Sequence, residues 1–152
     1  MTLAARPKDE EELRKLSIEM RFLEQTAETL QQRMQMLNAA ITDLTYANMT
    51  LDGIEKEKEN AELLVPIGGS SYIKVKLTES NKVIVGMGSG VSIEKTLPEA
   101  KGMVKERLGE LEKTMVSAQQ QFGQVAERIN VSRNRLESLL SSAREGKTPG
   151  NV

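Results

Sequence analysis

Apolar side chains along the first third of the chain recur in alternating steps of three and four residues. The series runs without a slip from Leu13 to Leu51, with one polar interruption at Asn48. This spacing places its members on one stripe of an α-helix and is typical of a coiled-coil seam. Pro7, followed by several acidic residues, favours a helix start just before the seam. The pattern predicts a first helix over residues 9–60, in which Asn48 either pins the helix register or stays hydrated near the helix end.

The last third of the chain repeats the same alternation of apolar positions. Thr96 and Glu99 precede it with the spacing of a capping box, which marks a helix N-terminus. Gly146 is typical of a residue just beyond a helix end. A second helix is therefore predicted over residues 97–145, and residues 146–152 are expected to form a disordered tail.

Between the two seams the hydrophobic period changes to two, the period of β-strands. Residues 73–77 and 83–85 flank a polar turn, and this arrangement predicts a β-hairpin. Glycines within residues 86–90 indicate a second turn, after which residues 91–93 alternate again. Residues 63–96 are therefore expected to hold about four short strands.

Two seams of equal length, joined by a compact insert, favour helices that fold back on each other as an antiparallel coiled coil. Residues 1–62 carry 8 basic and 13 acidic side chains and residues 97–152 carry 9 and 7, so their opposite net charges also favour pairing. About 45 to 50 helical residues make an arm on the order of 70 Å long. The predicted fold class is α+β, mainly α, a long antiparallel two-helix coiled coil with a central insert of two β-hairpins. The expected register pairs Leu51 with Val104, Leu30 with Val125 and Leu16 with Leu139.

The composition removes several classes of chemistry. The 152 residues include no His, no Cys and no Trp, so enzymes that need an imidazole base, a thiol nucleophile or a His/Cys metal site are excluded. A net charge of -1 provides no field that would hold nucleic-acid phosphates or an anionic membrane. No apolar run approaches the roughly 18 residues of a membrane span. We expect a cytoplasmic protein that is not an enzyme and binds no cofactor, metal, nucleic acid or membrane.

Blocks of residues in the insert point to a known family. Residues 63–69 read L-L-V-P-I-G-G, residues 82–91 read K-V-I-V-G-M-G-S-G-V, and Glu94 and Lys95 precede the second helix. In this order between two coiled-coil arms, the blocks closely resemble the alpha subunit of archaeal prefoldin, and the resemblance covers nearly the whole chain.

The resemblance implies an assembly and an activity. The assembly is a hexamer of two alpha and four beta subunits, with β-hairpins that form a double barrel and six coiled coils projecting from it. The activity is capture of non-native polypeptides between the coiled-coil tips, followed by transfer to a group II chaperonin without nucleotide. The implied partners are therefore beta subunits, unfolded polypeptides and the chaperonin.

Apolar side chains of the predicted strands are candidates for subunit assembly. Because a lone hairpin is marginal in water, its strand edges are expected to pair with strands of neighbouring subunits. The candidate residues are Ile73, Val75, Leu77, Val83, Val85, Met87, Val91 and Ile93.

The end of the coiled coil that contains the first and last parts of the chain is the candidate client-binding surface. An exposed Phe and aliphatic side chains gathered at one end of a polar arm make an adaptable surface for unfolded chains. The candidates off the seam are Ile18, Phe22, Val131 and Leu140. If this end frays, the seam residues Leu13, Leu16, Leu136 and Leu139 join them.

The sequence therefore predicts a subunit of an ATP-independent holdase, in which several weak contacts hold a client at once. The alternative is a structural or adaptor coiled coil that assembles through the same β insert and binds one folded partner. A specific partner requires a defined groove, whereas holdase action requires only exposed apolar tips.

Overall fold

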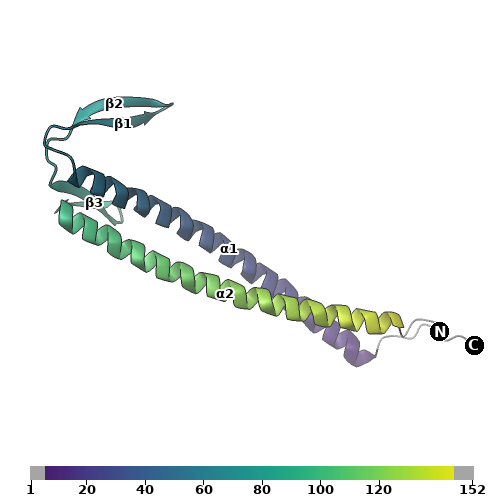
Figure 1. Ribbon diagram of the computed structural model, residues 1–152. Coiled ribbons are helices and arrows are strands. Elements are labelled where there is room, and N and C mark those ends of the chain that lie inside the picture. The colour runs from purple at the N-terminus through teal and green to yellow at the C-terminus, as the bar shows by residue number, and fades with distance from the viewer. Residues whose placement is uncertain (1–5, 146–152) are drawn as a thin grey trace, which may run out of the picture. The chain divides into compact units, whose positions relative to one another are not determined.

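The structure is a computed structural model and describes residues 6–145 as two long helices and four strands (Figure 1). This arrangement confirms the predicted fold class, whereas the predicted tail at residues 146–152 lies outside the described residues. Neither described helix combines the length and apolar content that crossing a membrane requires. The elements are α1 (Pro7–Glu55), β1 (Glu62–Gly68), β2 (Ser71–Lys76), β3 (Lys82–Gly88), β4 (Val91–Thr96) and α2 (Leu97–Glu145).

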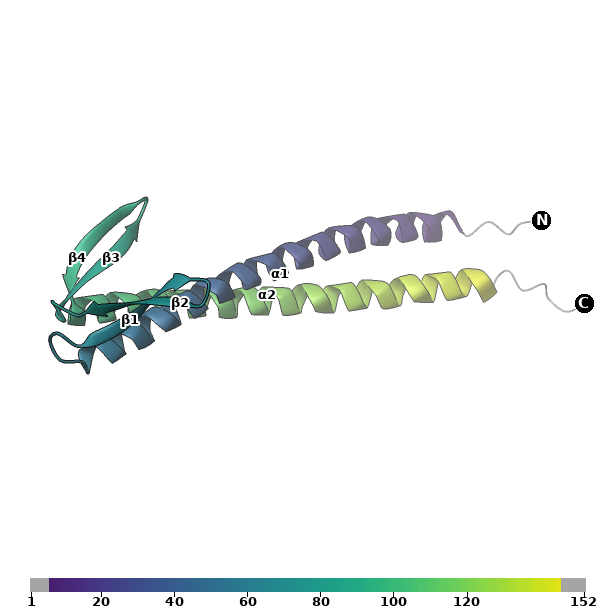
Figure 2. The same cartoon turned by 90° about the horizontal axis from the view of Figure 1, so that it is seen from above.

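The four strands pair as two antiparallel hairpins, β1 with β2 and β3 with β4 (Figure 2). The hairpin predicted between residues 73–77 and 83–85 is wrong, because these segments belong to β2 and β3, which lie in different sheets. Residues 77–81 connect the two hairpins. The true partner of β2 is β1, whose nearly continuous apolar run E-L-L-V-P-I-G lacks the alternation that reveals a strand.

Each hairpin closes with two residues in the left-handed backbone region. They are Gly69 and Ser70 in the first hairpin, with φ of 55° and 59°, and Ser89 and Gly90 in the second, with φ of 53° and 76°. Positive φ at both central residues is the geometry of a type I′ turn, whose twist matches that of paired strands. The second of these turns lies where the glycines of the sequence predict one.

The second hairpin repeats the register of the first with every position displaced by twenty residues. Val65 pairs with Ile73 in the first hairpin, and Val85 pairs with Ile93 in the second. The two hairpins differ in what they pack against, since Val85 is 7% exposed and the equivalent Val65 is 43% exposed. Val85 is therefore enclosed by its own chain, and Val65 is not.

Residues 38–113 form one compact unit, whose core is built by α1, β3 and α2. Leu51 and Val104, which the predicted register pairs, both belong to this core. Burial of these aliphatic side chains stabilises the hairpin end of each helix. The buried members are Leu51, Val85, Leu97, Ala100 and Val104.

The start of α2 is fixed by the capping box that the sequence predicts. The Thr96 hydroxyl accepts a hydrogen bond from the Glu99 amide, and the Glu99 carboxylate accepts one from the Thr96 amide, both at 3.3 Å. The Leu97 amide donates to the Asn81 carbonyl at 2.9 Å. Helix α2 therefore begins at Leu97 with its first amides satisfied by its own residues and by the connection between the hairpins.

Helix α1 ends at Glu55, five residues before the predicted end. After Ile54 the next five residues, E-K-E-K-E, offer no apolar side chain to the seam. The Lys56 and Glu57 amides donate to carbonyls three residues back, which tightens the last turn. Asn60 then takes a left-handed conformation and its amide donates to the Leu77 carbonyl, so the chain leaves the helix to enter the first hairpin.

Lys101 links the last turns of α1 to the first turns of α2. Its Nζ lies 2.8 Å from Asp52 Oδ1 and also pairs with the Glu55 carboxylate. The hydrogen bond from Lys101 lowers the pKa of Asp52, and the bonds to Asp52 and Glu55 raise the pKa of Lys101. Because the last turn of α1 contains no basic residue, Lys101 supplies the positive charge that a helix C-terminus favours.

Asn48 is the polar residue of the α1 seam. Its side-chain Oδ1 is buried and accepts no hydrogen bond from the described residues. Burial of this oxygen argues against full hydration of the side chain, and the part of Asn48 in setting the register stays a prediction.

The described parts of a second compact unit are residues 6–37 of α1 and 114–145 of α2. Glu12 pairs with Arg135 at 2.7 Å, and Glu19 pairs with Arg128 at 2.9 Å. These two ion pairs are one heptad apart on each helix and progress in opposite directions along the two sequences, so the helices pair antiparallel. The buried residues of this second unit all lie on the predicted seams. They are Leu23, Leu30, Ala118, Ser132 and Leu139.

Replacing Leu51 with Ala should destabilise the protein by about 2 to 5 kcal/mol, because the substitution leaves a cavity in the core of residues 38–113. Met49→Ala is the control on the same helix, because the Met49 side chain is exposed. We expect that variant to change the free energy of unfolding by no more than about 0.5 kcal/mol. Urea denaturation followed by circular dichroism measures both variants, and equal losses would contradict this core.

Asp52 should stabilise the protein at neutral pH and lose that effect in acid. Its folded-state pKa lies below its ordinary value, so its contribution is complete above the ordinary carboxyl range and falls as the pH drops through the folded-state pKa. The unfolding free energies of wild type and Asp52→Asn should therefore differ at about pH 7 and converge toward about pH 2. A difference that does not change with pH would contradict the role of the Lys101–Asp52 pair.

Candidate functional site

The candidate site is the end of the helix pair formed by the first turns of α1 and the last turns of α2. The ion pairs Glu12–Arg135 and Glu19–Arg128 join the two helices there. Hydrogen bonding to Arg135 lowers the pKa of Glu12, and the same contact raises the pKa of Arg135. Both shifts favour the charged forms, so these groups act as a structural pair and not as a tuned acid and base.

The four off-seam candidates are exposed. Phe22, the largest of them, is 67% exposed, and Ile18, Val131 and Leu140 are also open to solvent. Their exposure agrees with the heptad positions that the sequence gives them.

The structure does not gather these four side chains into one patch. Ile18 and Phe22 are four residues apart, so they are neighbours on the outer face of α1. Val131 and Leu140 are nine residues apart, which is two and a half helical turns, so they lie on opposite sides of α2. The end of the helix pair therefore presents apolar side chains in several directions.

The four seam candidates at this end differ in burial. Leu139 is buried, whereas Leu13, Leu16 and Leu136 are half-buried. The seam is therefore shielded from solvent at Leu139, whereas Leu13, Leu16 and Leu136 are partly accessible.

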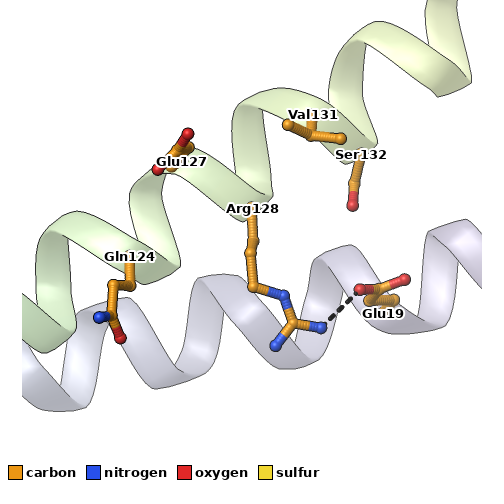
Figure 3. A pocket seen from close by; sticks show the side chains of 6 residues that line it. All are labelled: Glu19, Gln124, Glu127, Arg128, Val131 and Ser132. Carbon is orange, nitrogen blue, oxygen red and sulfur yellow. Dashed lines mark hydrogen bonds and ion pairs between the residues drawn. The ribbon is translucent and has the colours of Figure 1, made fainter.

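A groove of about 470 Å³ lies between the helices at this end (Figure 3). The Arg128 guanidinium reaches across to Glu19, while Gln124 and Val131 stand on either side of Arg128 along α2. The sequence pattern did not predict this groove, because it depends on the spacing of the helices. It is lined by Glu19, Gln124, Glu127, Arg128, Val131 and Ser132.

The assembly candidates are divided between the surface and the core. Val85 is buried among α1 and α2, so its side chain is not open to another subunit. Met87 is exposed and its sulfur accepts a hydrogen bond from Arg107 at 3.7 Å. The other exposed candidates are Ile73, Val91 and Ile93, and the half-buried ones are Val75, Leu77 and Val83.

Exposed apolar strand residues that the sequence reasoning missed lie mostly on β1 and β2. The long apolar run of β1 could have revealed them, because it places apolar side chains on both faces of a two-stranded hairpin. A hairpin with two uncovered apolar faces is typical of an element that packs against another chain. The missed residues are Leu64, Val65, Ile67, Tyr72 and Ile84.

Other candidate chemistry is sparse in the part of the chain that the structure describes. Residues 6–145 contain no group of three or more acidic side chains placed to hold a metal ion. Glu12, Asp52, Lys101 and Arg135, whose pKa values are shifted, are all members of ion pairs. The arrangement supports binding through exposed apolar side chains.

Comparison with known proteins gives a consistent family match. The model of the family described as "Prefoldin subunit" matches residues 23–142. The chain is 34% identical to prefoldin subunit alpha of Pyrococcus horikoshii over 119 residues, which covers 78% of this chain and 80% of that protein. It is 32% identical to prefoldin subunit alpha of Methanoculleus marisnigri over 143 residues, with coverage of 91% and 93%.

Two solved structures share the fold. A filamentous PFD from Methanocaldococcus jannaschii, determined by cryo-EM, matches with a TM-score of 0.64 and 23% identity, covering 74% of this chain and 93% of that one. The prefoldin beta subunit from Thermococcus strain KS-1 matches with a TM-score of 0.56 and 17% identity, covering 98% and 100%.

Amides near the start of α1, in residues 8–20, should exchange with deuterium faster than those of residues 23–34. Leu23 and Leu30 are buried, whereas the seam residues Leu13, Leu16 and Met20 are half-buried, so less free energy opposes local opening near the start of α1. Hydrogen-exchange mass spectrometry of the assembled protein measures this difference. Equal protection in the two segments would contradict a loosened end.

Proposed function

The chain belongs to the prefoldin family, and from this membership we propose that it is a subunit of an ATP-independent holdase that captures non-native polypeptides at the candidate site. The observation that carries the location is the exposed Phe22 beside Ile18 on α1. An aromatic ring in water gains free energy when it is covered by the apolar side chains of an unfolded chain. No nucleotide is required for such a contact.

Retention of a client depends on several weak contacts made at once. Burying one apolar side chain contributes only about 1.5 to 3 kcal/mol, which is too little to hold a client alone. Several helix ends in one assembly raise the effective concentration of each further contact. The different directions of Phe22, Val131 and Leu140 suit a client whose segments approach from different sides.

We assign assembly to the exposed hairpin faces, with beta-type subunits as partners in a hexamer of two alpha and four beta chains. The support for this assignment is the set of uncovered apolar side chains on β1 and β2, including Leu64, Ile67 and Tyr72. The proposal also includes a cytoplasmic location and delivery of clients to a group II chaperonin.

The test is suppression of aggregation of a chemically denatured protein without nucleotide, using this chain assembled with its candidate beta partner. The variant Phe22→Ser with Leu140→Ser removes exposed apolar surface from the candidate site and should raise the concentration needed for half-maximal suppression about tenfold. Light scattering gives the readout, and size-exclusion chromatography verifies assembly.

The matched control carries Tyr46→Ser and Met49→Ser, which remove two exposed apolar side chains from α1 outside the site. This control should suppress aggregation as wild type does. If the assembled wild type fails to suppress aggregation, the holdase function is wrong and the adaptor function replaces it. Equal losses in both variants would contradict the location.

A further inference from the structure

Helix α2 contains a stretch without a charged side chain, residues 114–126, which read T-M-V-S-A-Q-Q-Q-F-G-Q-V-A. At the chain average of 28% charged residues, thirteen positions would carry between three and four charges. Residues 25–42 of α1 are similarly poor in charge and carry only Glu28 and Arg33. The adjoining residues 127–145 of α2 return to a charged pattern, so the neutrality is local.

The neutral side chains are on the surface. Gln120, Gln121 and Gln124 are exposed, and Val116 on the same helix is 52% exposed. On α1, Met36 is 75% exposed. The outward positions of a coiled coil usually carry charges that keep them hydrated, and here they carry amide, thioether and aliphatic groups.

These groups suit contact with an extended polypeptide. A Gln side chain offers two donors and an acceptor, which match the C=O and N–H groups of a backbone that has no secondary structure. Contact with a charged side chain would require removal of its hydration shell, and this cost is much smaller for an amide. Met side chains adapt their shape to different apolar partners.

The neutral stretch ends beside the candidate site, at the groove between the helices. Gln124, the last glutamine of the stretch, lines the same groove as Val131 of the candidate site (Figure 3). A polypeptide held at Val131 that follows α2 passes Glu127 and the Arg128–Glu19 ion pair before it reaches Gln124.

We propose that the exposed side chains of residues 114–126 form a second contact surface for non-native polypeptides, one that accepts extended segments with few charges. This inference rests on the proposed holdase function and deepens it by naming the class of client segment. The terminal apolar side chains hold hydrophobic anchors of the client, and the neutral stretch holds the uncharged chain that follows. Because residues 114–126 carry no charge, contacts with them are not subject to the screening that weakens charge pairs in salt.

The test introduces charge into the neutral stretch in both signs, as Gln120→Glu with Gln121→Glu and as Gln120→Lys with Gln121→Lys. No charged residue lies within four positions of either site on α2, so neither pair creates an ion pair along the helix. The control, Lys105→Gln with Lys113→Gln, changes the net charge as much as the Glu variant does, on the same helix but outside the stretch. All four proteins are assembled with the beta partner and compared for suppression of aggregation of a client with few charges.

Both charged variants should need at least about threefold more protein for half-maximal suppression, while the control matches wild type. A photo-reactive residue at position 120 should also crosslink to the denatured client, and one at position 105 should not.

If both charged variants suppress aggregation like wild type, the second surface is wrong and the holdase function stands. If they change the mass of the assembly, another subunit covers this face and the inference is overturned. Failure of wild type itself would overturn the proposed function.

Discussion

A helix of 49 residues with one narrow apolar stripe cannot bury that stripe alone, and both long helices of this protein have this property. Each helix provides the surface that the other needs. In residues 38–113 the contact is a core in which Leu51 and Val104 meet β3, and in the second unit it is a seam with Leu23, Ala118 and Leu139 buried. The remaining features of the chain depend on keeping these stripes in register.

Ion pairs between α1 and α2 also help to keep the two helices in register, and these pairs differ in how far they are buried. Lys101 is half-buried between Asp52 and Glu55, so its contacts are partly shielded from solvent. In the pairs Glu12–Arg135 and Glu19–Arg128 the cation is more exposed, and screening weakens such pairs. Of these ion pairs, the most shielded cation therefore lies beside the hairpins and not at the helix ends where contact with clients is proposed.

The sequence predicted most of this fold because its signals are local. The seams depend on side-chain spacing, and the start of α2 depends on Thr96 and Glu99, which lie three residues apart. Which strands pair could not be predicted in the same way. The apolar run of β1 does not alternate with polar residues, so the sequence did not mark it as a strand, and β2 could have paired with either β1 or β3. Val85 was assigned to subunit contact because alternation shows which face of a strand is apolar and does not show what covers that face. The groove at Glu19 and Arg128 was missed because it arises from the separation of two helices.

The twenty-residue displacement between the hairpins has an evolutionary consequence. A substitution at Val85 must fit Leu51 and Val104, so a compensating change can arise within the same gene. A substitution at the equivalent Val65 meets no such enclosure by its own chain, and its compensation must come from whichever molecule covers it. Under the proposed assembly, two hairpins with one geometry are thus free to diverge under different selection, the second covarying with its own helices and the first with the subunit that covers it.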